Sequence, residues 1–184
     1  MQRFSYLDKE ADALYRQGHE FGDNEALAAA IEHYRALSVL FLREHMPWGW
    51  ATIQGKIGVV LRILGERESG TTYLEKAVEV CQATLEECTR EHAPLDWAAI
   101  QSRLGDALQR LGQRENSTSR LEQAVDAFRA ALEEQTRERG PFQWAMIKTN
   151  LGKALLLLGK RENGTVHLQE ALEVIKEARA FYRS

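Results

Sequence analysis

Residues 94–105 read PLDWAAIQSRLG, and two related stretches, PWGWATIQGKIG and PFQWAMIKTNLG, occupy residues 47–58 and 141–152. Each copy therefore starts 47 residues after the previous one. Two further phrases recur with the same period, namely Leu64-Gly65, Leu111-Gly112 and Leu158-Gly159, then Arg67-Glu68, Arg114-Glu115 and Arg161-Glu162. A fixed period of this length is typical of repeat proteins, in which each unit buries a face only by stacking on its neighbours. The sequence therefore predicts a stacked array.

Apolar spacing within one period predicts two helices. Trp97, Ile100, Leu104, Leu108 and Leu111 recur at steps of three and four, which places them on one helical stripe. We expect Gly112 to end that helix and Thr118 or Ser119 to cap a second one, which would run to Arg139. The same pattern predicts helices near 48–64, 71–92, 142–158 and 165–182.

The N-terminal part is a divergent copy of the same unit. A shift of 47 residues places Leu14 on Leu61 and Gly18 on Gly65, and it predicts helices near 3–17 and 24–45. Terminal units of a stack are expected to be atypical because one face meets water. No strand pattern occurs, so we expect a single all-α domain over 1–184, with units of approximately 1–46, 47–93, 94–140 and 141–184.

Two recurring features predict structural contacts. Gly58, Gly105 and Gly152 lie inside predicted helices, where a glycine costs about 1 kcal/mol relative to alanine. We therefore expect another helix's backbone or a large side chain to approach each of them closely. The three Arg-Glu loops predict a repeated structural contact, with the arginine bonding helix-end carbonyls or the glutamate accepting from loop amides.

Composition excludes several classes of function. The 184-residue chain has a net charge of −3, which argues against a general nucleic-acid binder. Its apolar stretches are too short to span a membrane and its start lacks a secretory core, so we expect a cytoplasmic protein. Cys81 and Cys88 are about 10 Å apart on one predicted helix and should not form a disulfide. Cys88 and His92 could touch a metal together, but no second pair completes a site, so no metal or cofactor is expected.

The segment Leu104-Gly105-x-x-Leu108, followed by Ala124, resembles the small-residue core of the tetratricopeptide repeat family. The 47-residue unit and its Leu-Gly-x-Arg-Glu loops resemble the long-unit, bacterial-type arrays of that family. The resemblance implies a right-handed superhelical solenoid of about four antiparallel helix pairs, with a concave groove lined by the first helix of each pair. It also implies a binding or scaffolding role without catalysis.

The family's groove positions, carried over by their distance from the helix glycine, predict a peptide-binding set that is mostly basic. The residues are Lys56, Arg62, Arg103, Asp106, Arg110, Asn150 and Lys153. Such a set could hold an acidic protein segment or a C-terminal carboxylate through charge-assisted hydrogen bonds. The alternative is a solvated face whose cations form internal ion pairs with Asp8, Asp12 and Asp106.

The last helix predicts a second kind of surface. It carries apolar residues although no polar helix follows to cover it, and residues of this kind at an open end mark an interface. The predicted interface residues are Leu172, Val174, Ile175, Phe181 and Tyr182. Two hypotheses thus compete: a protein-binding adaptor that uses its groove, and a scaffold that self-associates through its ends. An enzyme is disfavoured because no acid/base pair or metal set converges.

Overall fold

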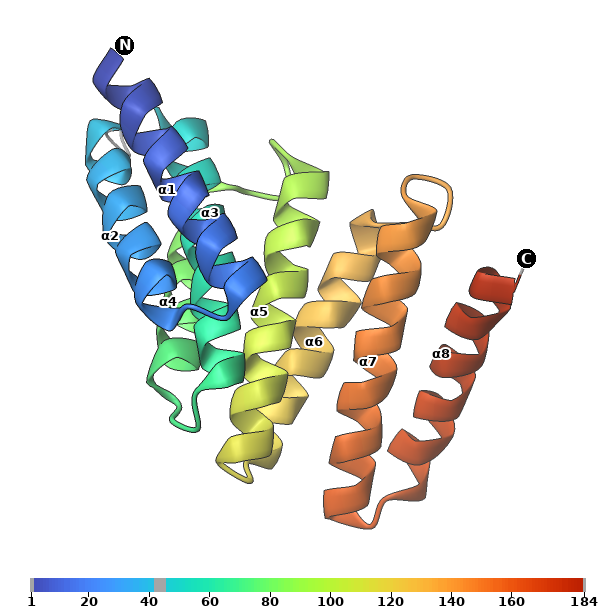
Figure 1. Ribbon diagram of the computed structural model, residues 1–184. Coiled ribbons are helices and arrows are strands. Elements are labelled where there is room, and N and C mark those ends of the chain that lie inside the picture. Colours follow the sequence, from blue (N-terminus) through green and yellow to red (C-terminus); the bar gives the residue numbers. More distant parts are fainter. Residues whose placement is uncertain (1, 42–45, 184) are drawn as a thin grey trace. The chain divides into compact units, whose positions relative to one another are not determined.

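The computed structural model describes residues 2–41 and 46–183, and all the regular structure in these ranges is helical. The helices are α1 (Gln2–Phe21), α2 (Asn24–Leu40), α3 (Pro47–Arg67), α4 (Thr72–Glu87), α5 (Pro94–Arg114), α6 (Thr118–Glu134), α7 (Pro141–Glu162) and α8 (Thr165–Arg183). They pack in consecutive pairs, α1–α2, α3–α4, α5–α6 and α7–α8, and Figure 1 shows each pair as an antiparallel hairpin joined by a short loop. The predicted all-α class is confirmed for the described residues.

The chain divides into two compact units, residues 1–88 with α1 to α4 and residues 89–184 with α5 to α8. Within each unit every helix packs on the next one in the chain, so the second hairpin stacks on the first. This solenoid-like order is the one that the 47-residue period predicts. The right-handed superhelix and the single domain over 1–184 stay predictions.

The same glycine–leucine contact joins the two helices of all four hairpins. A glycine near the end of each first helix faces a leucine of the second helix, in the pairs Gly18–Leu27, Gly65–Leu74, Gly112–Leu121 and Gly159–Leu168. At the last three glycines, a methyl group would lie only 2.5 to 2.9 Å from the leucine side chain. A glycine is needed there because the two helices approach too closely for any side chain.

The prediction that Gly112 ends its helix is therefore wrong. α5 continues to Arg114, and α7 continues past Gly159 to Glu162. The turn is made instead by Asn116 and Asn163, whose φ angles of 53° and 51° lie in the left-handed region. Asparagine tolerates this conformation better than other non-glycine residues, which explains its place after the helix.

Other predicted helix boundaries also need correction. The side chain of Ser117, rather than that of Thr118 or Ser119, caps α6 by accepting from the amide of Arg120. α4 and α6 end at Glu87 and Glu134, earlier than predicted, since Cys88 and Gln135 already leave the helical conformation. α2 ends at Leu40, and the predicted extension to residue 45 lies in part outside the described residues.

A second set of glycines confirms the predicted close approach at two of three positions. A methyl group at Gly105 would lie 2.7 Å from the ring of Phe128, which is completely buried, and one at Gly152 would clash with Ile175. At Gly58 the nearest atom is 3.8 Å away, on Val80. The reason lies in the sequence, because the small Cys81 stands at the repeat position of Phe128.

The arginines of the Arg-Glu loops tie consecutive hairpins together within each unit. Arg67 donates to the backbone carbonyls of Gly18 at 2.8 Å and His19 at 3.2 Å. Arg161 donates in the same way to the carbonyl of Ser117 at 3.1 Å. The expected structural role is thus confirmed for these two arginines, which satisfy carbonyls that a helix end or turn leaves without a partner.

We expect the same substitution to have opposite effects at two equivalent glycines. Gly58→Ala should leave the free energy of unfolding unchanged or raise it by up to about 1 kcal/mol, because the site has room and alanine favours the helix. Gly105→Ala should lower it by about 1 to 2 kcal/mol, because the Phe128 ring cannot move away. Urea unfolding of the two variants measures the difference. A gain at both positions would contradict the packing described at Gly105.

Candidate functional site

Four of the predicted groove residues form one surface on α5 and α7. The Asn150 side chain donates to the carboxylate of Asp106 at 2.8 Å, which links the two helices across 44 residues. Arg103 lies one turn before Asp106, and Lys153 lies one turn after Asn150. We call these four residues, Arg103, Asp106, Asn150 and Lys153, the α5–α7 surface.

The α5–α7 surface carries more positive than negative charge. Lys153 is exposed, and its Nζ lies 3.5 Å from Oδ1 of Asn150, at the limit of a hydrogen bond. Arg103 is also exposed, and it has no ion pair with any residue of the described ranges. Arg110, further along α5, is half-buried and already takes part in another interaction. Arg103 and Lys153 are therefore the two cations that this surface offers to a ligand.

Lys56, the equivalent of Arg103 in the preceding repeat, has a different environment. Its ammonium group binds the carboxylates of Asp8 at 2.8 Å and Asp12 at 2.9 Å. It also lies 5.2 Å from the centre of the Tyr34 ring, and the Tyr34 hydroxyl donates to Asp12 at 2.6 Å. The structure thus places Lys56 in the internal ion pairs that the sequence left open as an alternative.

The same residue spacing recurs in contacts within both units. Lys56 and Asp12 are 44 residues apart, as are Asn150 and Asp106, so one spacing produces both contacts. The residue 44 positions before Arg103 is Val59, which has no acceptor in its side chain. At this spacing, the sequence therefore has no carboxylate for Arg103 that would correspond to Asp12 for Lys56.

Burial and charge oppose each other in the Lys56 cluster. Burial alone would lower the pKa of Lys56, but the hydrogen bonds and charges of Asp8 and Asp12 outweigh it and raise that pKa. Burial would raise the pKa of Asp12, yet the hydrogen bonds from Tyr34 and Lys56 lower it. Burial and the Asp12 carboxylate together raise the pKa of Tyr34 strongly. All three groups are thus held in their usual charge states, which stabilises unit 1.

A cavity of about 230 Å³ opens beside this cluster in unit 1. It is lined by Asp12, Tyr15, Tyr34, Lys56 and Val59. Its charged groups already bind each other, so the cavity presents mainly aromatic and aliphatic surface. Arg62, one turn beyond Val59, pairs with Glu66 on its own helix. Both predicted groove cations of unit 1, Lys56 and Arg62, are therefore paired with carboxylates of the same unit.

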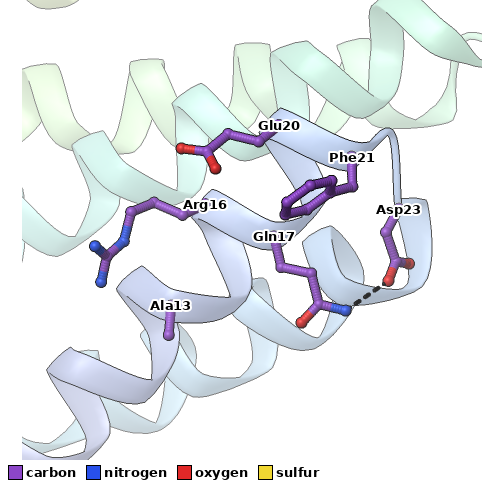
Figure 2. A pocket seen from close by; sticks show the side chains of 6 residues that line it. All are labelled: Ala13, Arg16, Gln17, Glu20, Phe21 and Asp23. Carbon is purple, nitrogen blue, oxygen red and sulfur yellow. Dashed lines mark hydrogen bonds between the residues drawn. The ribbon is translucent and has the colours of Figure 1, made fainter.

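A second, shallower pocket lies on α1 (Figure 2). It has a volume of about 510 Å³ and is lined by Ala13, Arg16, Gln17, Glu20, Phe21 and Asp23. The amide of Gln17 donates to Asp23 at 2.9 Å. Gln17 stands at the repeat position of Leu64, Leu111 and Leu158, which are all at most 2% exposed. The first repeat thus exposes a polar side chain at a position where the later repeats bury a leucine.

The described residues form no metal cluster, disulfide or membrane-spanning helix. Within them, no group of three or more histidine, cysteine, aspartate or glutamate side chains could hold a metal ion. Cys81 and Cys88 are buried and not joined in a disulfide. None of the described helices has the length and apolar character needed to cross a membrane.

Comparison with known families agrees with the resemblance seen in the sequence. The family model described as tetratricopeptide repeat matches residues 50–93, which include most of α3 and all of α4. This segment is thus similar to a tetratricopeptide repeat. Repeats of this family serve as scaffolds for protein–protein interactions, whereas the 47-residue length of the unit rests on the sequence period alone.

Among solved structures, the matches extend over nearly the whole chain but have low sequence identity. The DHF58 filament matches with a TM-score of 0.49 and 16% identity, over 99% of this chain and 93% of that one. The de novo designed helical repeat protein DHR64 matches with a TM-score of 0.46 and 17% identity, over 99% and 94%. No curated protein sequence matches the chain significantly.

The residues predicted to form the C-terminal interface divide into two groups in the structure. Val174 is only 7% exposed and Ile175 packs on Gly152, so both are occupied within the α7–α8 hairpin. Leu172 and Tyr182 are 53% and 58% exposed, and Phe181 is half-buried among other aromatic rings. Leu172, Phe181 and Tyr182 are the members of the set that a partner could reach.

Sequence reasoning missed two arginine–tryptophan contacts. Arg90 lies 5.4 Å from the Trp97 ring and Arg137 lies 5.9 Å from the Trp144 ring. Both arginines stand seven residues before a repeat tryptophan, so the 47-residue period itself was the signal. Both tryptophans are half-buried and lie in the first turn of α5 and α7.

We expect Lys56→Met to lower the free energy of unfolding at pH 7 by about 1 kcal/mol, a modest value because the paired groups are about one-third exposed. The lowered pKa of Asp12 means that its stabilisation exists above the ordinary value of 3.8 and is lost as the pH falls through the folded-state pKa. The raised pKa of Lys56 means that the stabilisation from its charged ammonium group is complete below pH 10.5. It is lost as the pH rises through the folded-state pKa. The loss in Lys56→Met should therefore shrink below pH 3.8.

Arg62→Met is the matched control, because it removes an ion pair within a single helix. It should cost at most about 0.5 kcal/mol. Denaturant unfolding between pH 2.5 and pH 7 measures both variants. An effect of Lys56→Met that persists unchanged at pH 2.5 would contradict the ion-pair account.

Proposed function

We propose that the chain is a non-enzymatic protein-interaction module that binds an acidic segment of a partner on the α5–α7 surface. The observation that carries the proposal is the pair of exposed cations, Arg103 and Lys153, beside a fixed side-chain amide at Asn150. The family match supports the coarse function, and the charge of the surface supports an anionic ligand. Arg110 and the groove residues of unit 1, Lys56 and Arg62, have internal contacts and would be secondary.

The chemistry of the surface fits a carboxylate ligand. An arginine offers a planar pair of donors, and a lysine offers a compact charge, so two carboxylates or one C-terminal group could bind between them. The side-chain nitrogen of Asn150 already donates to Asp106, and its oxygen, which Lys153 approaches only at 3.5 Å, retains a lone pair for a backbone amide of the ligand. Asp106 adds a negative charge that would disfavour cationic segments. The surface is therefore suited to select acidic segments and to fix the direction in which their backbone binds.

Binding of a defined probe tests this proposal. Fluorescein-labelled hexaglutamate, with either a free or an amidated C-terminus, is titrated with the protein and followed by anisotropy. Arg103→Glu/Lys153→Glu should weaken binding about tenfold or more, because each reversed charge replaces attraction by repulsion. Stronger binding of the free-carboxylate form would favour recognition of a chain terminus, and equal binding would favour recognition of acidic side chains.

The matched control is Lys176→Glu/Arg179→Glu, which reverses the same number of exposed charges on α8 of the same unit. It should retain most of the affinity, with only a small loss from the change in net charge. Circular dichroism should show unchanged helicity in both variants. Equal losses in the two variants would mean that binding follows net charge and not the α5–α7 surface.

A specific observation favours the alternative function, a scaffold that acts through its ends. Leu172 is 53% exposed, although Ile31, Val78 and Val125 at the same repeat position are at most 6% exposed. Each of α2 and α6 is followed in its unit by a helix that packs on it, whereas no helix follows α8 among the described residues. The Leu172 side of α8 is thus an apolar surface that no helix of the described residues covers.

Charge disfavours pairing of two such α8 faces. Lys176, Arg179 and Arg183 follow Leu172 at helical steps of four, seven and eleven, so they share its stripe. Two α8 helices side by side would bring these cations together. Light scattering should therefore show a monomer, and a dimer that Leu172→Lys dissociates would instead support the scaffold function.

A further inference from the structure

Arg90 has a complete binding environment within the chain. Its guanidinium group donates to Glu134 at 2.7 Å and to Glu133 at 2.5 Å, and it lies 5.4 Å from the centre of the Trp97 ring. The two glutamates are adjacent at the C-terminal end of α6. An arginine on a tryptophan thus binds a pair of neighbouring carboxylates in this protein.

Arg137 is the repeat equivalent of Arg90, but it lacks this carboxylate pair. It lies 5.9 Å from the ring centres of both Trp144 and Phe181. The residues equivalent to Glu133 and Glu134 are Ala180 and Phe181. No ion pair joins Arg137 to a carboxylate within the described ranges, and its side chain is exposed.

The neighbouring acidic residue does not replace the missing pair. The pKa of Glu138 is lowered first by a hydrogen bond from its own backbone amide, then by one from Thr136, and only last by the charge of Arg137. Its carboxylate is thus held by the loop. The guanidinium group of Arg137 therefore keeps its hydrogen-bonding edge for a ligand.

Exposed aromatic side chains surround this arginine. The Phe181 ring makes edge contacts with Phe142 and Tyr182, each with centroids 5.4 Å apart. Phe142 is 70% exposed and Tyr182 is 58% exposed. Lys148 lies 5.7 Å from the Trp144 ring and is paired with Glu177 at 2.7 Å, so Arg137 is the cation that faces solvent without a carboxylate. Arginine beside large aromatic rings is the composition typical of interface hot spots.

We propose that Arg137, Phe142, Trp144, Phe181 and Tyr182 form a docking site for a partner segment with two adjacent glutamates. The occupant is inferred from the internal contact of Arg90, where a Glu-Glu pair binds an arginine that rests on the equivalent tryptophan. The carboxylates bind the guanidinium group, and apolar side chains beside them cover the exposed rings. This docking site is separate from the α5–α7 surface, because Trp144 and Lys153 lie on opposite sides of α7.

A capped peptide copied from the chain provides the probe. Its sequence, Ala-Ala-Leu-Glu-Glu-Gln, is that of residues 130–135, and acetyl and amide caps remove the terminal charges. Titration into the full chain should shift the indole NH resonance of Trp144, assigned with Trp144→Phe. The same peptide with Gln-Gln in place of Glu-Glu should bind about tenfold more weakly or not at all.

Three variants make the test specific to Arg137. Arg137→Gln should weaken binding about tenfold, whereas Arg90→Gln should leave binding intact because its site is already filled. Ala180→Glu should also weaken binding, because it restores one carboxylate of the Arg90 type and competes from within the chain. Gln169→Glu is its control, since it adds the same charge elsewhere on α8 and should bind the peptide normally.

Several outcomes would overturn the proposal. These are equal binding of the Glu-Glu and Gln-Gln peptides, normal binding by Arg137→Gln, and normal binding by Ala180→Glu. Self-association that Arg137→Gln abolishes would also overturn it, because the occupant would then be a second copy. Arg103→Glu/Lys153→Glu should keep the Trp144 shift, so failure of this site and failure of the α5–α7 surface can be distinguished.

Discussion

The contact between a helix glycine and a leucine of the next helix is the constraint on which each hairpin depends. It occurs in all four hairpins, including the first, where the Trp-Ala phrase is missing. Leu27, Leu74 and Leu121 are completely buried in it, and burial of such a side chain stabilises by about 2 kcal/mol. Close approach of the helices fixes their register, and the register then decides which polar side chains of neighbouring first helices can meet.

That register separates the repeated cations into two groups. Lys56 and Arg90 meet pairs of carboxylates from their own unit, so their charges stabilise the fold. Arg103 and Arg137 stand at the equivalent positions of the following repeats and meet none in the described ranges. A charge without an internal partner remains hydrated and can bind an external anion at a low desolvation cost. Divergence between repeats thus creates the candidate binding surfaces.

The sequence predicted the architecture well because its period and its apolar stripes follow directly from helix geometry. It failed at helix ends, since Gly112 and Gly159 are needed for close packing while Asn116 and Asn163 make the turns. A glycine near the end of an apolar stripe has two possible uses, and only the position of the next helix distinguishes them.

The candidate site was only partly predictable, for a similar reason. Family offsets placed Lys56 and Arg103 at equivalent positions, but only the structure shows that Lys56 pairs with Asp12, 44 residues earlier, whereas Arg103 has no ion pair in the described ranges. That spacing is not part of the 47-residue phrase and becomes visible only when the helices are stacked. Arg137 was missed because its lack of a carboxylate pair is visible only by comparison with Arg90. Ala180 and Phe181 stand at the repeat positions of Glu133 and Glu134, which bind Arg90.

The central claim is that internal ion pairs decide which repeated cations bind a partner. It is tested most directly by recording the side-chain NH resonances of lysines and arginines by NMR while hexaglutamate is added. The account predicts shifts at Arg103 and Arg137, with Lys56 and Arg90 unchanged. Equal shifts at all four residues, or shifts confined to Lys56 and Arg90, would contradict it.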